Sequence, residues 1–189
     1  MIFLRLYLLA GLVFHKAVWE GLKRRPGRPA EAAKPPSRRR LLIRAVKIGI
    51  LLGIACQVFL PDVLPMLDQS LPLRVAGTAL YTLGLTLAVA GRVQLGTNWS
   101  DIEVGRVASE HQVVCHGVYR YLRHPIYVGD LALLIGLELA LNSWLVAAAA
   151  MLVPPVLAKA VQEERTLRQA LLGYEEYARR TKRFIPFII

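Results

Sequence analysis

The sequence predicts an all-α fold, an integral membrane bundle of about five transmembrane helices followed by a helical C-terminal tail. Of the 189 residues, 55% are hydrophobic, and they fall in long runs rather than in short amphipathic periods. Backbone groups in lipid must be paired within their own segment, so a run of about 20 apolar residues is expected to be a helix. The net charge of +11 would suggest a nucleic-acid partner for a soluble protein. Here the basic residues instead sort by loop, as membrane topology demands, and no nucleic-acid partner is expected.

The apolar runs of spanning length cover residues 2–22, 45–66, 72–91, 125–141 and 143–161. The first run contains Arg5 and lacks the pattern of a cleaved signal peptide, so we expect it to be retained as a span or as a signal anchor. Pro154 and Pro155 fall inside the fifth run and should break its hydrogen-bond ladder. Beyond this run, helices are expected over residues 163–172 and 174–183, separated at Gly173.

The loops differ in charge, and this difference predicts the orientation. Residues 23–47 contain ten Lys or Arg residues and one acid, whereas the connection at 61–72 carries Asp62 and Asp68 and no base. The positive-inside rule therefore predicts a multi-pass protein with the N-terminus outside and the C-terminus in the cytoplasm. The basic, loop-poor layout is typical of a bacterial protein, so we expect a bacterial inner membrane. The basic, proline-rich linker at 23–44 should be cytoplasmic, where it either attracts anionic membrane lipids or serves topology alone. We expect an N-terminal region of three spans at 1–91 and a second region at 92–189, which contains the last two spans and the C-terminal tail.

The strongest candidate site lies in residues 117–129, which read G-V-Y-R-Y-L-R-H-P-I-Y-V-G. Pro125 suits the first turn of a helix, so the fourth helix should begin directly after His124. The positive dipole end and the free N–H groups of that helix favour an anionic group such as a carboxylate. The tyrosines and arginines would also fit an interfacial belt, but a belt does not require His-Pro.

Ionisable residues accompany the fourth and fifth runs. Lys159 and Glu163 are four residues apart on one helix face, where they can form an ion pair or bind a ligand, and Glu164 can pair in the same way with Arg168. Two further acids, Asp130 and Glu138, lie inside the fourth run and should face the bundle or water, with roles that remain open. The two cysteines indicate neither a disulfide nor a metal framework, and no metal is expected.

With Glu163-Glu164, Gly173, Tyr177 and the ending R-F-I-P-F-I, this motif resembles the isoprenylcysteine carboxyl methyltransferase family. The family hallmark is R-H-P-x-Y-x-G followed by a distant E-E, and the resemblance covers roughly residues 92–187. It implies S-adenosylmethionine as the methyl donor, a lipophilic isoprenylcysteine-like or prenylated carboxylate as the acceptor, and a cytosolic tail that covers the cofactor site.

The resemblance also implies roles for individual residues. The adenosine would be contacted by His111, Gln112, Val113 and Val114, in a pocket bounded by Tyr119. The methionine part of the cofactor would be held by His124, Pro125, Ile126 and Tyr127, with Glu163 paired to its ammonium group. Lys159 stands where eukaryotic members have an Arg that contacts the substrate carboxylate, and Arg123 would replace or assist it. The expected catalytic residues are therefore Arg123, Lys159 and Glu163.

Other functions share this architecture. Membrane sterol and enone reductases carry R-H-P-x-Y-x-G but bind NADPH, and they have R-D-E-x-x-C where this chain has Q-E-E-R-T-L. A phospholipid N-methyltransferase would need to deprotonate its amine acceptor, and the cations Lys159 and Arg123 would repel that acceptor. A non-enzymatic membrane scaffold is a third alternative. The sequence leaves open the methyl acceptor and the oligomeric state.

Overall fold

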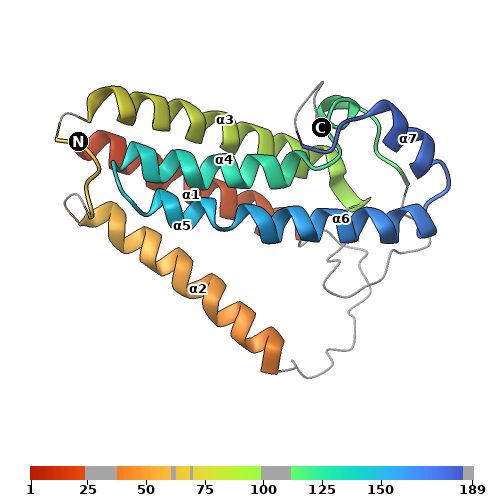
Figure 1. The fold of residues 1–189 in the computed structure, drawn as a ribbon, viewed down its shortest axis with the longest axis horizontal. Coiled ribbons are helices and arrows are strands. Elements are labelled where there is room, and N and C mark those ends of the chain that lie inside the picture. The colour runs from red at the N-terminus through yellow and green to blue at the C-terminus, as the bar shows by residue number, and fades with distance from the viewer. Residues whose placement is uncertain (24–37, 61–62, 69, 99–111, 185–189) are drawn as a thin grey trace. The chain divides into compact units, whose positions relative to one another are not determined.

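The structure is a computed structural model that describes residues 1–23, 38–60, 63–68, 70–98 and 112–184. These residues are mainly helical, and Leu122 and Lys182 form an isolated parallel bridge. In chain order the elements are α1 (Ile2–Lys23), α2 (Arg38–Phe59), α3 (Leu71–Leu95), η1 (Gly96–Asn98), η3 (Gly117–Arg120), α4 (Pro125–Ala140), α5 (Val146–Ala150), α6 (Val153–Ala170) and α7 (Tyr174–Arg180) (Figure 1). The chain divides into two compact units, Met1–Pro65 and Met66–Ile189, and the second contains the candidate site.

The first unit consists mainly of α1 and α2. The guanidinium of Arg5 donates hydrogen bonds to the carbonyls of Val58 and Leu60, which ties the start of α1 to the end of α2. The predicted bounds of α1 are confirmed, but those of the second span, 45–66, are wrong by seven residues at each end. Helix α2 begins earlier because Arg and Lys are good helix formers, and it ends shortly before Pro61, ahead of which helical backbone is disfavoured.

Helices α3 and α4 confirm two further predicted elements, and the break at the proline pair is confirmed as well. Helix α5 ends at Ala150 and α6 begins at Val153, so the prolines occupy the first turn of α6. Residues 163–170 continue α6 without interruption, so the helix expected over 163–172 is not a separate element. The helix after Gly173 ends at Arg180 rather than at 183 because the next residues pair with another segment.

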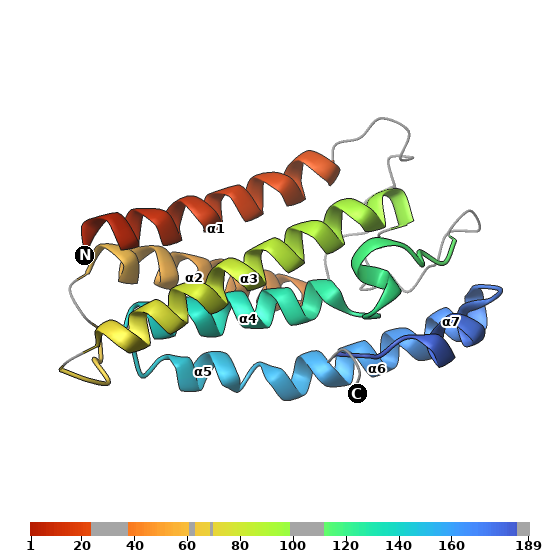
Figure 2. The ribbon, with the colours of Figure 1, turned by 90° about the horizontal axis from the view of Figure 1, so that it is seen from above.

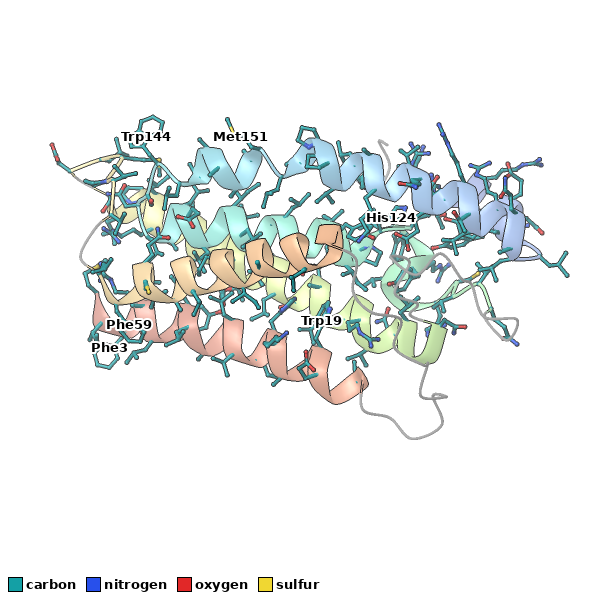
Figure 3. The ribbon with its side chains drawn as sticks, turned by 90° about the horizontal axis from the view of Figure 1, so that it is seen from below. Phe3, Trp19, Phe59, His124, Trp144 and Met151 are labelled. Atoms are coloured by element: carbon teal, nitrogen blue, oxygen red, sulfur yellow. The ribbon has the colours of Figure 1, made fainter. Side chains whose placement is uncertain are left out.

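Three helical segments among the described residues are long and apolar enough to cross a membrane, namely Ile2–Leu22, Leu71–Leu95 and Val146–Ala170. Helix α4 has 16 residues and is about 24 Å long, shorter than the roughly 30 Å of a hydrocarbon core. Large apolar side chains point outward in Figure 3, including Trp144 and Met151, which are 59% and 76% exposed. Such exposure fits a surface covered by lipid rather than by water. Glu138, within α4, is instead buried, as expected for a carboxylate in an apolar helix.

The closest packing in the second unit joins α3 to α4, which lie side by side in Figures 1 and 2. A Cβ placed on Gly129 would lie 2.5 Å from the amide nitrogen of Ala88, and one on Gly136 would lie 2.8 Å from the Cα of Tyr81. The two backbones touch because glycine has no side chain at these crossings. This contact fixes the position of α4 and therefore of the residues at its first turn.

The far end of α4 is held by a buried turn. Asn142 has a left-handed backbone, with φ of 57°, and is 1% exposed. Nδ2 of Asn142 donates to the backbone carbonyl of Leu67 at 2.8 Å, and Oδ1 of Asn142 accepts from the backbone amide of Leu67 at 3.2 Å. The turn between α4 and α5 is thereby attached to the segment that precedes α3.

Candidate functional site

The site begins where the loop after η3 enters α4. His124 precedes the helix with a φ of −123°, and Pro125 occupies its first turn, so the predicted boundary is confirmed. The loop also pairs in parallel with the chain after α7. The amide of Arg123 donates to the carbonyl of Lys182 at 2.8 Å, and the amide of His124 donates to that of Arg183 at 3.3 Å. The motif is therefore joined to the C-terminal segment by main-chain hydrogen bonds.

Glu164, on α6, pairs with the charged groups around this junction. Its side chain is 2% exposed. One carboxylate oxygen, Oε1, accepts from Nε of Arg123 at 2.9 Å and lies 3.2 Å from Nε2 of His124. Arg183 donates to both oxygens at 2.9 Å, a bidentate pair of the kind that gives arginine its geometric specificity. One buried carboxylate thus faces two guanidinium groups and one imidazole.

Arg123 makes further contacts that turn it toward α7. Its guanidinium donates to the carbonyl of Ala178 at 2.8 Å and to that of Thr181. The side chain is 9% exposed. Its hydrogen bonds are therefore directed to α6 and to the chain around the end of α7.

A second group of residues surrounds Tyr127, in the first turn of α4. The phenol hydroxyl donates to Oε2 of Glu163 at 2.7 Å. The ammonium of Lys159 lies 5.8 Å from the centroid of the same ring, within cation–π range. Tyr127 consequently contacts an anion through its hydroxyl and a cation through its ring.

The imidazole of His124 connects the two groups. Its ring stacks on Tyr127 with a centroid separation of 5.5 Å and on Phe184 with a separation of 5.7 Å. His124 is 6% exposed and lies among the helices in Figure 3. Its ring is restrained by two aromatic faces and by the Glu164 carboxylate at its edge.

Buried tyrosines lie at the contact between η3 and α7. Tyr177 donates its hydroxyl to the carbonyl of Tyr119 at 2.9 Å, in a buried hydrogen bond. Burial raises the pKa of Tyr119, Tyr174 and Tyr177 well above the ordinary tyrosine value. All three therefore stay neutral hydrogen-bonding groups at physiological pH.

The structure brings some of the predicted site residues together. His124 and Tyr127 stack, Tyr127 contacts both Glu163 and Lys159, and Arg123 reaches the group through Glu164. The Lys159–Glu163 and Glu164–Arg168 pairs that spacing allowed are replaced by these contacts. Arg168 instead pairs with Glu175 at 2.5 Å.

Other predicted residues lie in different surroundings. Pro125 and Ile126 pack against Gly91 of α3, where a Cβ would lie 3.2 Å and 3.0 Å from their side chains. The backbone amide of Gln112 donates to Oδ1 of Asn98 at 2.8 Å. Val113 and Val114 are half-buried in the same loop, Tyr119 is buried, and His111 lies outside the described residues.

Sequence reasoning gave no role to Glu164, Arg183 or Phe184, although it noted the E-E pair and the R-F-I-P ending. Residue spacing favoured a partner for Glu164 on its own helix. The sequence contains the carboxylate and both arginines, but they are far apart in the chain, and only the fold shows that they pair.

Comparison with known proteins places this chain in a family. A sequence profile described as phospholipid methyltransferase matches residues 73–172, just over half of the chain. The chain belongs to the phospholipid methyltransferase family. The matched residues of this family member include most of α3 and all of α4, α5 and α6, and they contain Tyr127, Lys159 and both glutamates of the site.

The chain is similar to the protein-S-isoprenylcysteine O-methyltransferase of Schizosaccharomyces pombe. The two chains are 30% identical over 112 residues, which cover 56% of this chain and 46% of the yeast enzyme. The cobalt-zinc-cadmium resistance protein CzcN of Cupriavidus metallidurans is 36% identical over 110 residues, covering 55% of this chain and 46% of CzcN. The chain thus spans about half the length of these two curated relatives.

The fold is shared with a solved structure of the eukaryotic intramembrane Ras methyltransferase ICMT. The TM-score is 0.62 at 21% sequence identity, and the match covers 97% of this chain and 65% of that one. The resemblance to isoprenylcysteine carboxyl methyltransferases that the sequence predicted is confirmed.

Proposed function

We propose that this protein is an S-adenosylmethionine-dependent methyltransferase that esterifies the carboxylate of a lipophilic, isoprenylcysteine-like acceptor at the membrane surface. The observation that carries the proposal is the arrangement around Tyr127, where a carboxylate and an ammonium group contact the same aromatic side chain. A zwitterionic, amino-acid-like donor needs an anion for its ammonium group, and a carboxylate acceptor needs a cation.

The chain's own residues fit the donor. Glu163 is only partly buried, and its Oε2 is oriented by the Tyr127 hydroxyl, which leaves Oε1 for an ammonium group. We assign His124, Pro125, Ile126 and Tyr127 to the methionine part, and His111, Gln112, Val113, Val114 and Tyr119 to the adenosine. When bound, S-adenosylmethionine supplies an electrophilic methyl group on a sulfonium centre.

Lys159 is assigned to the acceptor. A carboxylate is ionised at neutral pH, so the residues need only orient it and exclude water, and no general base is required. The Lys159 side chain is exposed on α6, and its ammonium contacts a neutral ring, which leaves it able to bind a carboxylate. Arg123 was the other candidate, but its hydrogen bonds go to Glu164 and to two carbonyls. These contacts favour Lys159.

The membrane arrangement is part of the proposal. We infer spans at α1, α2, α3, α4 and the α5–α6 pair, with residues 1–91 anchoring a catalytic region at 92–189. The basic segment at 23–44 and the site would then face the cytoplasm of a bacterial cell, with the C-terminal tail over the cofactor and the N-terminus outside. The acceptor would enter from the bilayer.

Thermal unfolding of the detergent-purified protein tests the cofactor. S-adenosylhomocysteine at about 100 times its dissociation constant should stabilise the fold by about 2.7 kcal/mol. We expect Glu163→Gln to abolish this shift, Lys159→Gln to retain it, and Glu176→Gln, which removes an exposed carboxylate on α7, to leave it unchanged. Stabilisation by NADPH alone would favour a reductase, and stabilisation by neither compound would favour a scaffold.

Transfer of a labelled methyl group tests the acceptor. A farnesylated cysteine with a free carboxylate should be labelled, and Lys159→Gln should raise its KM more than it lowers kcat. Labelling of phosphatidylethanolamine in its place would show that the acceptor is an amine and would overturn the assignment of Lys159.

A further inference from the structure

The C-terminal segment 181–184 is attached to the start of α4, and its side chains Arg183 and Phe184 have no role in the proposed reaction. Its backbone pairs with residues 121–124, and the ring of Phe184 stacks on that of His124. Arg183 reaches across to α6, where it donates two hydrogen bonds to Glu164. Main-chain hydrogen bonds, ring stacking and an ion pair therefore all attach this four-residue segment.

Glu164 is placed to hold these elements together rather than to meet a ligand. Its carboxylate is almost fully buried and lies within 2.9 Å of two guanidinium groups, one from the motif and one from the C-terminal segment. The hydrogen bonds with Glu164 also raise the pKa of Arg183, as expected for a cation paired with a buried carboxylate. Removing either arginine leaves the buried carboxylate underpaired, which is unfavourable.

We propose that Arg183 and Glu164 are positioning residues, which dock the C-terminal segment and thereby fix the imidazole of His124 in one orientation and one tautomer. Neither residue needs to touch donor or acceptor. Ligand binding at the site depends on Arg183 because docking of residues 181–184 places Phe184 against the imidazole. That the imidazole meets the methyl donor rests on the proposed function, whereas its tautomer does not.

The tautomer follows from the contact at the ring edge. Nε2 of His124 lies 3.2 Å from an oxygen of Glu164, and an ionised carboxylate accepts hydrogen bonds but donates none. The proton of the neutral ring therefore resides on Nε2, and Nδ1 remains an acceptor. Stacking on Tyr127 and Phe184 restrains the plane of the ring.

Nitrogen-15 NMR of histidine-labelled protein tests the tautomer without any ligand. The chain has four histidines, so the spectrum is sparse, and a His124→Gln variant assigns the relevant signals. At about pH 8.5, where a free imidazole is neutral, we expect wild-type His124 to show the Nε2–H form alone. Arg183→Gln and Glu164→Gln should each shift it to a mixture of both tautomers.

Lys182→Gln is the matched control, because it removes one positive charge from an exposed neighbour whose backbone makes the same pairing. This variant should keep the wild-type tautomer. Arg183→Lys should restore it in part, since lysine keeps the charge but loses the bidentate geometry. It is also the milder variant that decides the question if Arg183→Gln does not fold.

Calorimetric titration with S-adenosylhomocysteine supplies the second measurement. Arg183→Gln should weaken binding about tenfold, Lys182→Gln less than about twofold, and Arg183→Lys should fall between them. An unchanged His124 tautomer in folded Arg183 variants would overturn the positioning role, as would equal losses of affinity in the Lys182 and Arg183 variants. Failure of the wild-type protein to bind S-adenosylhomocysteine would instead refute the proposed donor, and the NMR result would still stand.

Discussion

Gly129→Ala would place a methyl group in the contact between α4 and α3. The new Cβ would lie 2.5 Å from the amide nitrogen of Ala88 and 2.8 Å from its Cβ. Ordinary contacts of this kind are about 3.5–4.0 Å, so the overlap is roughly 1 Å. The atoms it meets belong mainly to the main chain of α3, which cannot rotate away as a long side chain could. The two helices must therefore move apart.

The magnitude follows from two opposing effects. Overpacking of a well-packed contact destabilises by about 1–3 kcal/mol, and a clash with main chain belongs at the upper end of that range. Alanine is favoured over glycine in a helix by about 1 kcal/mol, which offsets part of the loss. The net destabilisation is about 2 kcal/mol, or a melting temperature lower by about 4–8 °C for a chain of this size.

The assay is thermal unfolding in detergent, with two matched substitutions. Gly53→Ala on α2 introduces the same methyl group where nothing lies within 4 Å, so it should stabilise by up to about 1 kcal/mol. Gly136→Ala lies on the same α3–α4 contact as Gly129 but seven residues along the helix, about 10 Å from it. It should lower stability like Gly129→Ala while weakening S-adenosylhomocysteine binding less, because Gly129 lies two residues from Tyr127.

An unaltered melting temperature for Gly129→Ala would show that α3 and α4 do not touch at this crossing. Equal losses of affinity in the two α4 variants would show that the position of the first turn does not control the site. Either result would refute the reasoning that the glycine of the motif serves helix packing and, through it, the placement of Tyr127.

Three further expectations use the same preparations. Tyr127→Phe keeps the ring beside Lys159 but removes the 2.7 Å hydrogen bond to Glu163, so S-adenosylhomocysteine affinity should fall about tenfold in titrations while the melting temperature changes little. Asn142→Ala removes two hydrogen bonds to Leu67 and strains a left-handed backbone, so it should destabilise by about 2–4 kcal/mol, and Asn142→Gly should recover only the strain, by about 1–2 kcal/mol, in thermal unfolding. Burial raises the pKa of Tyr119, Tyr174 and Tyr177 above the unfolded value of about 10. Their contribution to stability should therefore be complete below about pH 10 and be lost as the pH rises above it. A melting temperature that does not change between pH 9 and about pH 11 would contradict this.

The sequence was sufficient to predict most of the helical elements of the described region. Apolar runs and prolines act locally, so α1, α3, α4 and the break before α6 followed from composition and from the position of Pro154. The error at α2 has the opposite origin. Hydropathy located the apolar part of that helix, whereas the helix extends through basic residues that favour helical backbone without being apolar.

The candidate site was predictable as a set of residue types but not as a set of partners. The i to i+4 rule offered Glu163 to Lys159 and Glu164 to Arg168, because spacing along one helix is all that a single sequence reveals. In the folded chain, Tyr127 from α4 competes for Glu163, and two arginines about 20 and 40 residues away compete for Glu164. Those partners are brought close by the α3–α4 contact and by the pairing of residues 121–124 with 182–183, neither of which has a local signature.

The arginines show how this limits functional assignment. As a bidentate cation in the motif, Arg123 was a reasonable partner for the acceptor carboxylate, and charge alone does not separate it from Lys159. What separates them is the competition for each cation. A guanidinium that already bonds a buried carboxylate and two carbonyls would have to give up those partners to bind an acceptor, and the carboxylate would be left underpaired. Among the described residues, the Lys159 ammonium would give up a cation–π contact with Tyr127, of the order of 1 kcal/mol, and this smaller loss is the reason for proposing Lys159 rather than Arg123 as the partner of the acceptor carboxylate.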